Sequence, residues 1–127
     1  MGFWGWLFGV SGHKKIDIDW LEIESRQRQI EALPKQGQLG YKQAIVEYDK
    51  LIDGLMKELI TGTTFAERLK GLRAKFPKGL YSSLWKAHIK RNELVHDSGS
   101  YVADWELMDF MRSYRDSVSF LRSLSIR

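Results

Sequence analysis

The chain has 127 residues, no cysteine and a formal net charge of +4 at pH 7, and 43% of its residues are hydrophobic. This length favours one domain, and the lack of cysteine excludes disulfides, thiol nucleophiles and thiolate metal sites. An aromatic share of 13%, with five tryptophans, is typical of a chain with a folded core and not of a disordered one.

Charge is distributed unevenly along the chain. Residues 1–60 carry eight Lys/Arg against nine Asp/Glu, whereas residues 61–127 carry twelve against seven. In the second half eight basic residues follow one another with no acidic residue between them: Arg68, Lys70, Arg73, Lys75, Lys78, Lys86, Lys90 and Arg91. Such a run favours a polyanionic partner such as RNA, and an ordinary solvated helix face is the alternative interpretation.

Residues 1–10 form the most apolar stretch, and His13, Lys14 and Lys15 follow it closely. A membrane-spanning helix needs about 20 apolar residues, so this stretch is too short to span. It also lacks the basic start and small-residue cleavage site of a secretory signal. Aromatic side chains in front of lysines suit shallow contact with a membrane surface, while packing on the domain or on a partner chain is the alternative. The predicted contact residues are Phe3, Trp4, Trp6, Leu7 and Phe8.

We therefore predict an apolar aromatic segment over 1–15 and one helical domain over 16–127. Apolar residues recur at helical spacing in five segments, and neither a strand pattern nor a glycine-rich phosphate loop is present. The predicted helices cover 18–33, 41–59, 64–76, 80–97 and 103–124, with a loop over 35–40. Short loops between long amphipathic helices predict an all-α, up-and-down bundle of four to five helices.

The fourth predicted helix carries polar residues in unexpected places. In a helical projection its apolar stripe comprises Leu80, Leu84, Ala87, Leu94 and Val95. Arg91 lies in the middle of this stripe, where it is costly unless it is paired or lines a wet cleft. Asn92 and His96 are four residues apart on the adjoining flank, so their side chains can meet. Arg91 and His96 are about 140° apart and converge only if the helix ends or unwinds near His96, or if a second copy supplies the other half.

Structural roles for these polar residues are the alternative. Arg91 would then pair with a carboxylate of the last helix, the candidates being Asp104, Glu106, Asp109 and Asp116. A histidine near the C-terminus of a helix is often a cap or a partner of the helix dipole. His13 and His88 have no partner pattern and are predicted to be structural or surface residues. The three histidines form no compact ligand motif with carboxylates, so no metal site is predicted.

The segment Arg91-Asn92-x-x-x-His96, at the end of an amphipathic helix, resembles the R-x4-6-H signature of HEPN domains. Asn92 matches the polar residue that commonly follows the arginine in catalytic members, and the resemblance covers roughly residues 41–124. It implies a HEPN-like bundle that pairs as a two-fold dimer, with the motif helices of both subunits lining one cleft. In catalytic members this cleft cuts RNA without a metal or other cofactor, by attack of the ribose 2′-oxygen on the adjacent phosphate.

The resemblance implies three roles. His96 is the expected general acid/base, Arg91 the residue that holds the scissile phosphate, and Asn92 the residue that orients the phosphate or His96. These roles fit the chemistry, because guanidinium binds phosphate at any working pH and imidazole titrates near neutrality. The additional RNA contacts expected from the basic run are Lys86, Lys90, Arg68, Lys75 and Lys78.

One departure from the family concerns partners. Members that pair with a nucleotidyltransferase antitoxin often carry tyrosine two residues after the histidine. Ser98 stands there, and Tyr101 is the nearest tyrosine. An antitoxin or nucleotidyltransferase partner stays an expectation, but the tyrosine that would be modified is missing from its position.

Three functions follow as hypotheses. The first is a cytoplasmic, homodimeric, metal-independent RNA endonuclease of HEPN type, a toxin or defence effector. The second is a non-catalytic HEPN module that binds RNA or nucleotide through the same cleft. The third is a helical interaction module held at the membrane surface by residues 3–10, in which Arg91 is structural. Under the first two, the site is expected in a dimer cleft.

Overall fold

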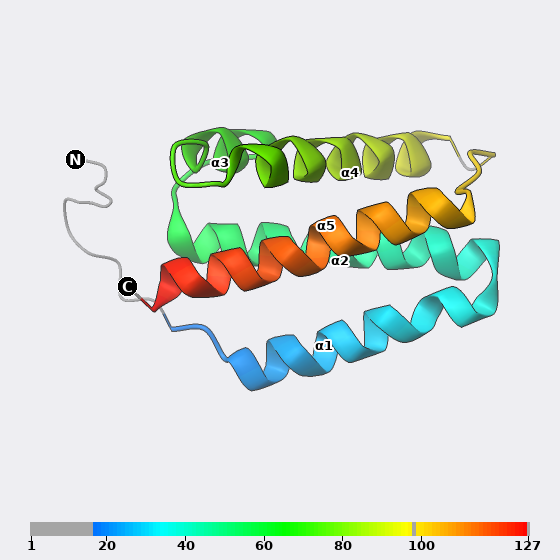
Figure 1. Ribbon diagram of the computed structural model, residues 1–127, viewed down its shortest axis with the longest axis horizontal. Helices are drawn as coiled ribbons and strands as arrows, with labels where there is room; N and C mark the ends of the chain where they lie inside the picture. Colours follow the sequence, from blue (N-terminus) through cyan, green and yellow to red (C-terminus); the bar gives the residue numbers. More distant parts are fainter. Residues whose placement is uncertain (1–16, 98, 127) are drawn as a thin grey trace.

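The computed structural model describes residues 17–97 and 99–126. This part of the chain folds into five packed α-helices and a short 3-10 helix, without a strand (Figure 1). The all-α prediction is confirmed. The elements are α1 (Trp20–Ala32), η1 (Leu33–Gln36), α2 (Gln38–Leu59), α3 (Phe65–Gly71), α4 (Lys78–His96) and α5 (Asp104–Ser125). The segment predicted for membrane contact, residues 1–15, and the serine at position 98 lie outside the described residues.

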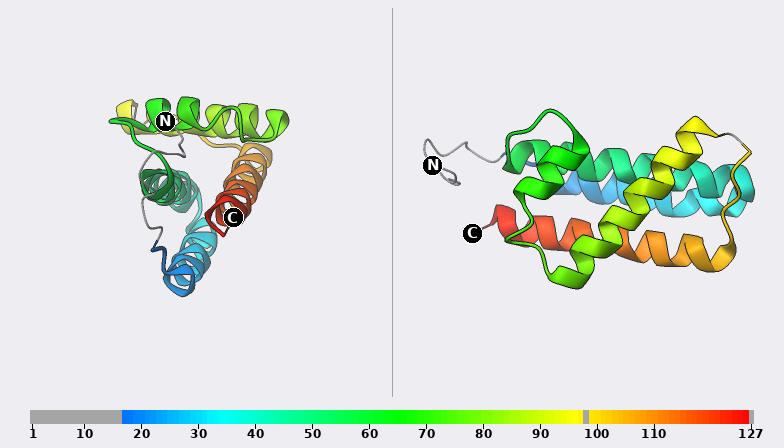
Figure 2. Two further views of the ribbon diagram at one scale, coloured as in Figure 1. Left: turned by 90° about the vertical axis from the view of Figure 1, so that its left-hand side faces the viewer. Right: turned by 90° about the horizontal axis from the view of Figure 1, so that it is seen from above.

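The long helices alternate in direction and form three layers. Figure 2 shows α2 and α5 side by side in the middle, with α1 on one side and α3 and α4 on the other. Seen from above, α4 crosses α2 and α5 obliquely (Figure 2). Because α4 rests on both middle helices, its side chains can meet groups from either one.

The core runs along α2, whose apolar residues recur every three or four positions. Its fully or nearly fully buried members are Ala44, Ile45, Tyr48, Leu51, Ile52, Leu55 and Met56. Leu84, Ala87 and Leu94 of α4 are buried against this layer, as the projection of that helix predicts. No helix within the described ranges is both long enough and apolar enough to cross a membrane.

The predicted loop over 35–40 is wrong, because the chain re-enters a helix at Gln38. Gly37 makes the turn with a φ of 79°, a conformation that L side chains rarely adopt. Gly40 lets the start of α2 pass close to η1, since a Cβ at this position would lie 1.9 Å from the carbonyl oxygen of Leu33. Two glycines therefore replace an open loop by a tight corner.

The third helix begins as predicted and ends earlier. Thr64 caps α3 by accepting a hydrogen bond from the backbone N–H of Glu67 at 3.1 Å. The helix stops at Gly71 instead of residue 76. The chain turns there and brings Phe76 into the core against Phe120, with ring centroids 4.5 Å apart. The start of α3 is the part that matters for the site, because it fixes Phe65.

Candidate functional site

A buried carboxylate on α2 organises the polar residues of α4. Asp49 is 3% exposed and lies at the edge of the apolar stripe of α2, about 40° from Ile45 in a helical projection. Its Oδ2 is 3.0 Å from Nδ1 of His88 and accepts a hydrogen bond from the Tyr114 hydroxyl at 3.2 Å. The Nε of Arg91 lies 3.8 Å from the other oxygen, Oδ1. Asp49 thus faces partners from both α4 and α5.

Tyr114 anchors Asp49 from the far side. Burial raises the pKa of the Tyr114 hydroxyl well above its ordinary value of 10.0, and the charge of Asp49 raises this pKa further. The hydroxyl therefore keeps its proton and donates to Asp49 at any working pH. The ring of Tyr114 stacks on Tyr48 at a centroid distance of 5.3 Å, which holds the donor in place.

His88, predicted to be a structural or surface residue without a partner, is buried and belongs to this network. Phe65 of α3 stacks on its ring, with centroids 3.9 Å apart and planes 3° from parallel. The second ring nitrogen, Nε2, is 3.5 Å from Nδ2 of Asn92, a long hydrogen-bond distance. His88 therefore connects the buried Asp49 to a residue of the predicted site.

Arg91 is neither sealed in the core nor free in solvent. Its side chain is 36% exposed, and NH1 donates to Oδ1 of Asn92 at 2.9 Å. Its Nε is buried without a hydrogen-bond partner among the described residues and faces Asp49. The alternative in which a carboxylate of the last helix pairs with Arg91 is wrong, because the acidic neighbour comes from α2. Asp104 of α5 instead accepts a hydrogen bond from the Tyr41 hydroxyl.

His96 lies apart from Arg91 and Asn92. It is exposed in the last turn of α4, and the helix stays regular through it, with the N–H of Asp97 donating to the Glu93 carbonyl at 2.8 Å. No hydrogen bond or ion pair within residues 17–97 and 99–126 joins His96 to Arg91 or Asn92. The structure therefore brings together Arg91 and Asn92, adds Asp49 and His88 to them, and leaves His96 one turn away.

The flank of α4 beyond His88 carries exposed apolar side chains. Val95, predicted in the core stripe, is 53% exposed, and Ile89 is exposed as well. The reason is that α3 is only seven residues long, and its Phe65 covers α4 at His88. The last two turns of α4 thus present apolar and polar groups together.

Two residues of the basic run are held inside the protein. Arg68, predicted to contact RNA, is buried and pairs with Asp53 of α2 at 2.8 Å. Lys90 is largely covered, and its Nζ lies 3.2 Å from Glu93 and donates to the Tyr101 carbonyl at 3.0 Å. Arg68 holds α3 on α2, and Lys90 holds α4 on the segment before α5, so neither is proposed as an RNA contact.

The other three lysines do not gather around Arg91. Lys75 and Lys78 are exposed near the start of α4, and Lys78 is about 20 Å along the helix axis from Arg91. Lys86 is exposed on the opposite flank, where it lines a hollow with Trp105 and Asp109 of α5. The basic run therefore extends over α3, the segment after it and α4, and these three lysines do not form one patch with Arg91.

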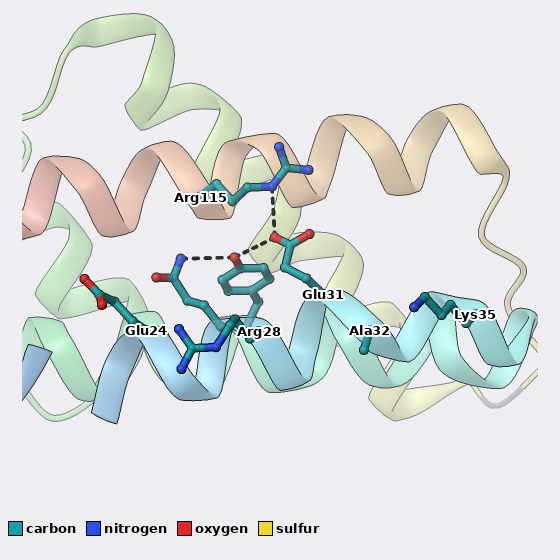
Figure 3. A pocket seen from close by; sticks show the side chains of 8 residues that line it. Glu24, Arg28, Glu31, Ala32, Lys35 and Arg115 are labelled. Atoms are coloured by element: carbon teal, nitrogen blue, oxygen red, sulfur yellow. Dashed lines mark hydrogen bonds and ion pairs between the residues drawn. The ribbon is translucent and has the colours of Figure 1, made fainter. Parts of the chain in front are cut away.

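A second hollow lies between α1 and α5, away from α4 (Figure 3). At its floor Tyr48 donates to Glu31 at 2.8 Å and accepts from Gln27 at 3.1 Å. Arg115 donates to the same carboxylate at 2.9 Å. Burial and the Glu31 carboxylate raise the pKa of Tyr48 above its ordinary value. The charges at the floor satisfy one another, so the contacts hold α1 against α5.

Within the described residues no group of three or more His, Asp or Glu side chains is arranged to hold a metal ion. Comparisons of the chain with known protein families, with curated proteins and with solved structures found no match. The assignment of function therefore depends on the residues of the site.

Proposed function

We propose that the protein is a metal-independent RNA endonuclease of HEPN type whose site is assembled from two copies of the chain. The observation that carries this proposal is the state of Arg91. Its guanidinium is held from behind by Asp49 and Asn92, yet its side chain is more than one-third exposed. The guanidinium of such an arginine is held in one orientation, and its solvent-exposed N–H groups stay available to donate to a phosphate.

The proposed reaction uses the three residues of the motif. Arg91 binds the phosphate between two nucleotides and stabilises the negative charge that grows on it. Asn92 orients the phosphate through its amide. His96 takes part in proton transfer as the ribose 2′-oxygen attacks phosphorus and the bond from phosphorus to the 5′-oxygen breaks. The products are a 2′,3′-cyclic phosphate and a free 5′-hydroxyl.

The regular shape of α4 supports a composite site. Arg91 and His96 are about 140° apart on an undistorted helix, and α4 remains helical through His96. One copy therefore does not present both groups to one phosphate. A second copy packed on the exposed flank of α4 would bring its His96 to the Arg91 of the first and would cover Ile89 and Val95. Homodimerisation is thus part of the proposal.

A non-catalytic module that binds RNA or nucleotide is the second candidate. The observation that favours it is the separation of His96 from Arg91, because the pair Arg91–Asn92 can hold a phosphate without any acid/base group. Salt-sensitive binding without cleavage would mark this function. An antitoxin or nucleotidyltransferase partner, cytoplasmic location and membrane contact through residues 1–15 stay predictions.

The test is cleavage of a fluorogenic RNA in EDTA, with the 3′ ends analysed for cyclic phosphate. We expect cleavage by the wild type and its loss in Arg91→Ala and His96→Ala. Arg112→Ala is the matched control, because Arg112 is an exposed arginine on α5 whose ion pair, with the exposed Asp109, is long at 3.5 Å. RNA binding by the wild type without cleavage supports the second candidate, and unchanged cleavage by His96→Ala contradicts the first.

A further inference from the structure

A directed chain of polar groups leads from the core to the surface. The Asp49 carboxylate only accepts hydrogen bonds, so the Nδ1 of His88 that faces both of its oxygens, at 3.0 and 3.2 Å, carries a proton. At the outer end, NH1 of Arg91 only donates, so the atom of Asn92 that it meets at 2.9 Å is the carbonyl oxygen Oδ1. The donor and the acceptor are therefore known at both ends of this series of hydrogen bonds.

The direction of the hydrogen bond between Asn92 and His88 follows from these two contacts. With Oδ1 turned to Arg91, the Nδ2 of Asn92 faces Nε2 of His88 and donates toward it. Nε2 must then present a lone pair, which requires the tautomer with its proton on Nδ1. A proton on Nε2 would set two donors against each other and turn the Asn92 amide away from Arg91. Only one arrangement of these protons agrees with all three contacts: Asp49 with His88, His88 with Asn92, and Asn92 with Arg91.

We propose that Asp49 and His88 are positioning residues that set the Asn92 amide and, through it, the Arg91 guanidinium toward the phosphate. This inference rests on the proposed function. Asp49 holds the ring of His88, and Phe65 stacked on that ring keeps it in one plane. The second N–H of Asn92 has no partner among the described residues and is left to donate to a phosphate oxygen. Neither positioning residue touches the substrate.

Two substitutions of His88 separate positioning from simple packing. Both remove the ring that stacks on Phe65. In His88→Asn the shorter amide reaches Asp49, as Nδ1 does, and leaves the place of Nε2 empty. In His88→Gln the longer amide reaches the place of Nε2, where its oxygen accepts from Asn92. Positioning through Asn92 therefore predicts that His88→Gln keeps more activity than His88→Asn.

The first measurement is kcat for RNA cleavage beside the thermal midpoint of unfolding of each variant. We expect kcat of His88→Asn to lie about tenfold below that of His88→Gln, the loss of one hydrogen bond in the transition state, without a matching order of stability. A purely packing role for His88 predicts that kcat follows the unfolding midpoint in both variants. That result would overturn the inference.

The second measurement needs neither activity nor a variant. Nitrogen-15 NMR of the wild type identifies the protonated ring nitrogen of His88, and we expect Nδ1–H with Nε2 bare. A proton on Nε2 at neutral pH would overturn the inference whatever the kinetics show. If the wild type does not cleave RNA but this tautomer is found, the proposed function fails, while the arrangement of Asp49, His88 and Asn92 stands.

Discussion

The composite site makes a quantitative prediction for mixed dimers. Arg91→Ala and His96→Ala are each expected to be inactive, since each removes one half of both sites in a homodimer. In a dimer of one chain of each kind, the Arg91 of one chain faces the His96 of the other. One of the two sites is therefore intact and the other lacks both groups.

The expected size of the recovery follows from this pairing. When the variants exchange subunits freely at equal concentration, half of the dimers are mixed and each has one working site of two, so activity returns to about one quarter of the wild-type value. A site built within one chain predicts no recovery, because no chain in the mixture carries both residues. The separation of Arg91 and His96 on α4 thus leads to a measurable fraction of recovered activity.

The assay is cleavage of a fluorogenic RNA in EDTA after the two variants have been mixed. Native mass spectrometry of chains that differ in mass verifies that subunits have exchanged. A mixture of Arg91→Ala with the double variant lacking both residues is the control, and it is expected to stay inactive. Exchanged mixed dimers without recovered cleavage, or a chain that cleaves RNA as a monomer, would refute the composite site.

The remaining predictions concern stability, measured by urea unfolding. Tyr114→Phe removes a buried donor to Asp49, and we expect it to lower the free energy of unfolding by about 1.5–3 kcal/mol. Arg68→Ala leaves Asp53 without its partner in a partly buried pair, and we expect a loss of about 3 kcal/mol. Hydrogen bonds from Thr63 lower the pKa of Glu67 below its ordinary value of 4.5. The contribution of Glu67 to the free energy of unfolding is therefore present above the unfolded pKa and is lost as pH falls through the folded pKa. Glu67→Gln should therefore destabilise the protein at pH 7, and this difference should shrink as pH falls below the unfolded pKa.

Each of these has a contrary result. A Tyr114→Phe protein as stable as the wild type would mean that Asp49 does not need this donor. An Arg68→Ala protein that unfolds at the same urea concentration as the exposed-site variant Arg112→Ala would contradict the structural role of Arg68. A stability difference between wild type and Glu67→Gln that grows as pH falls from 7 into the acidic range would contradict the lowered pKa of Glu67.

Much of the fold could be predicted from local sequence. The spacing of apolar residues located the long helices, and the Thr64 cap located the start of α3. The corner between α1 and α2 escaped prediction because residues 35–40 read as a polar loop. Its geometry depends on the close approach of Gly40 to the carbonyl of Leu33, a tertiary contact without a local signal.

The site was predicted only in part, for a similar reason. Projection of α4 marked Arg91 as misplaced, but it paired Asn92 with His96, whereas the structure pairs Asn92 with Arg91. The carboxylate partners expected for Arg91 were all on the last helix. Asp49 carries a usable signal, because it is a charged residue at the edge of the apolar stripe of α2, about 40° from Ile45. Two misplaced opposite charges on neighbouring helices indicate a pair. The role of His88 had no such signal, since it depends on Phe65 arriving from α3.

Asp49 and Asp53 lie one turn apart on α2, and each binds a side chain of a different helix. Asp49 contacts His88 of α4, and Asp53 forms an ion pair with Arg68 of α3. A core of leucine and isoleucine alone tolerates sliding of one helix along another by a turn, about 5.4 Å. Here a slip of α4 would carry its histidine away from Asp49 and leave a buried charge uncompensated, or bring it against the carboxylate that Arg68 already occupies. The two aspartates therefore fix the position of α3 and α4 along α2.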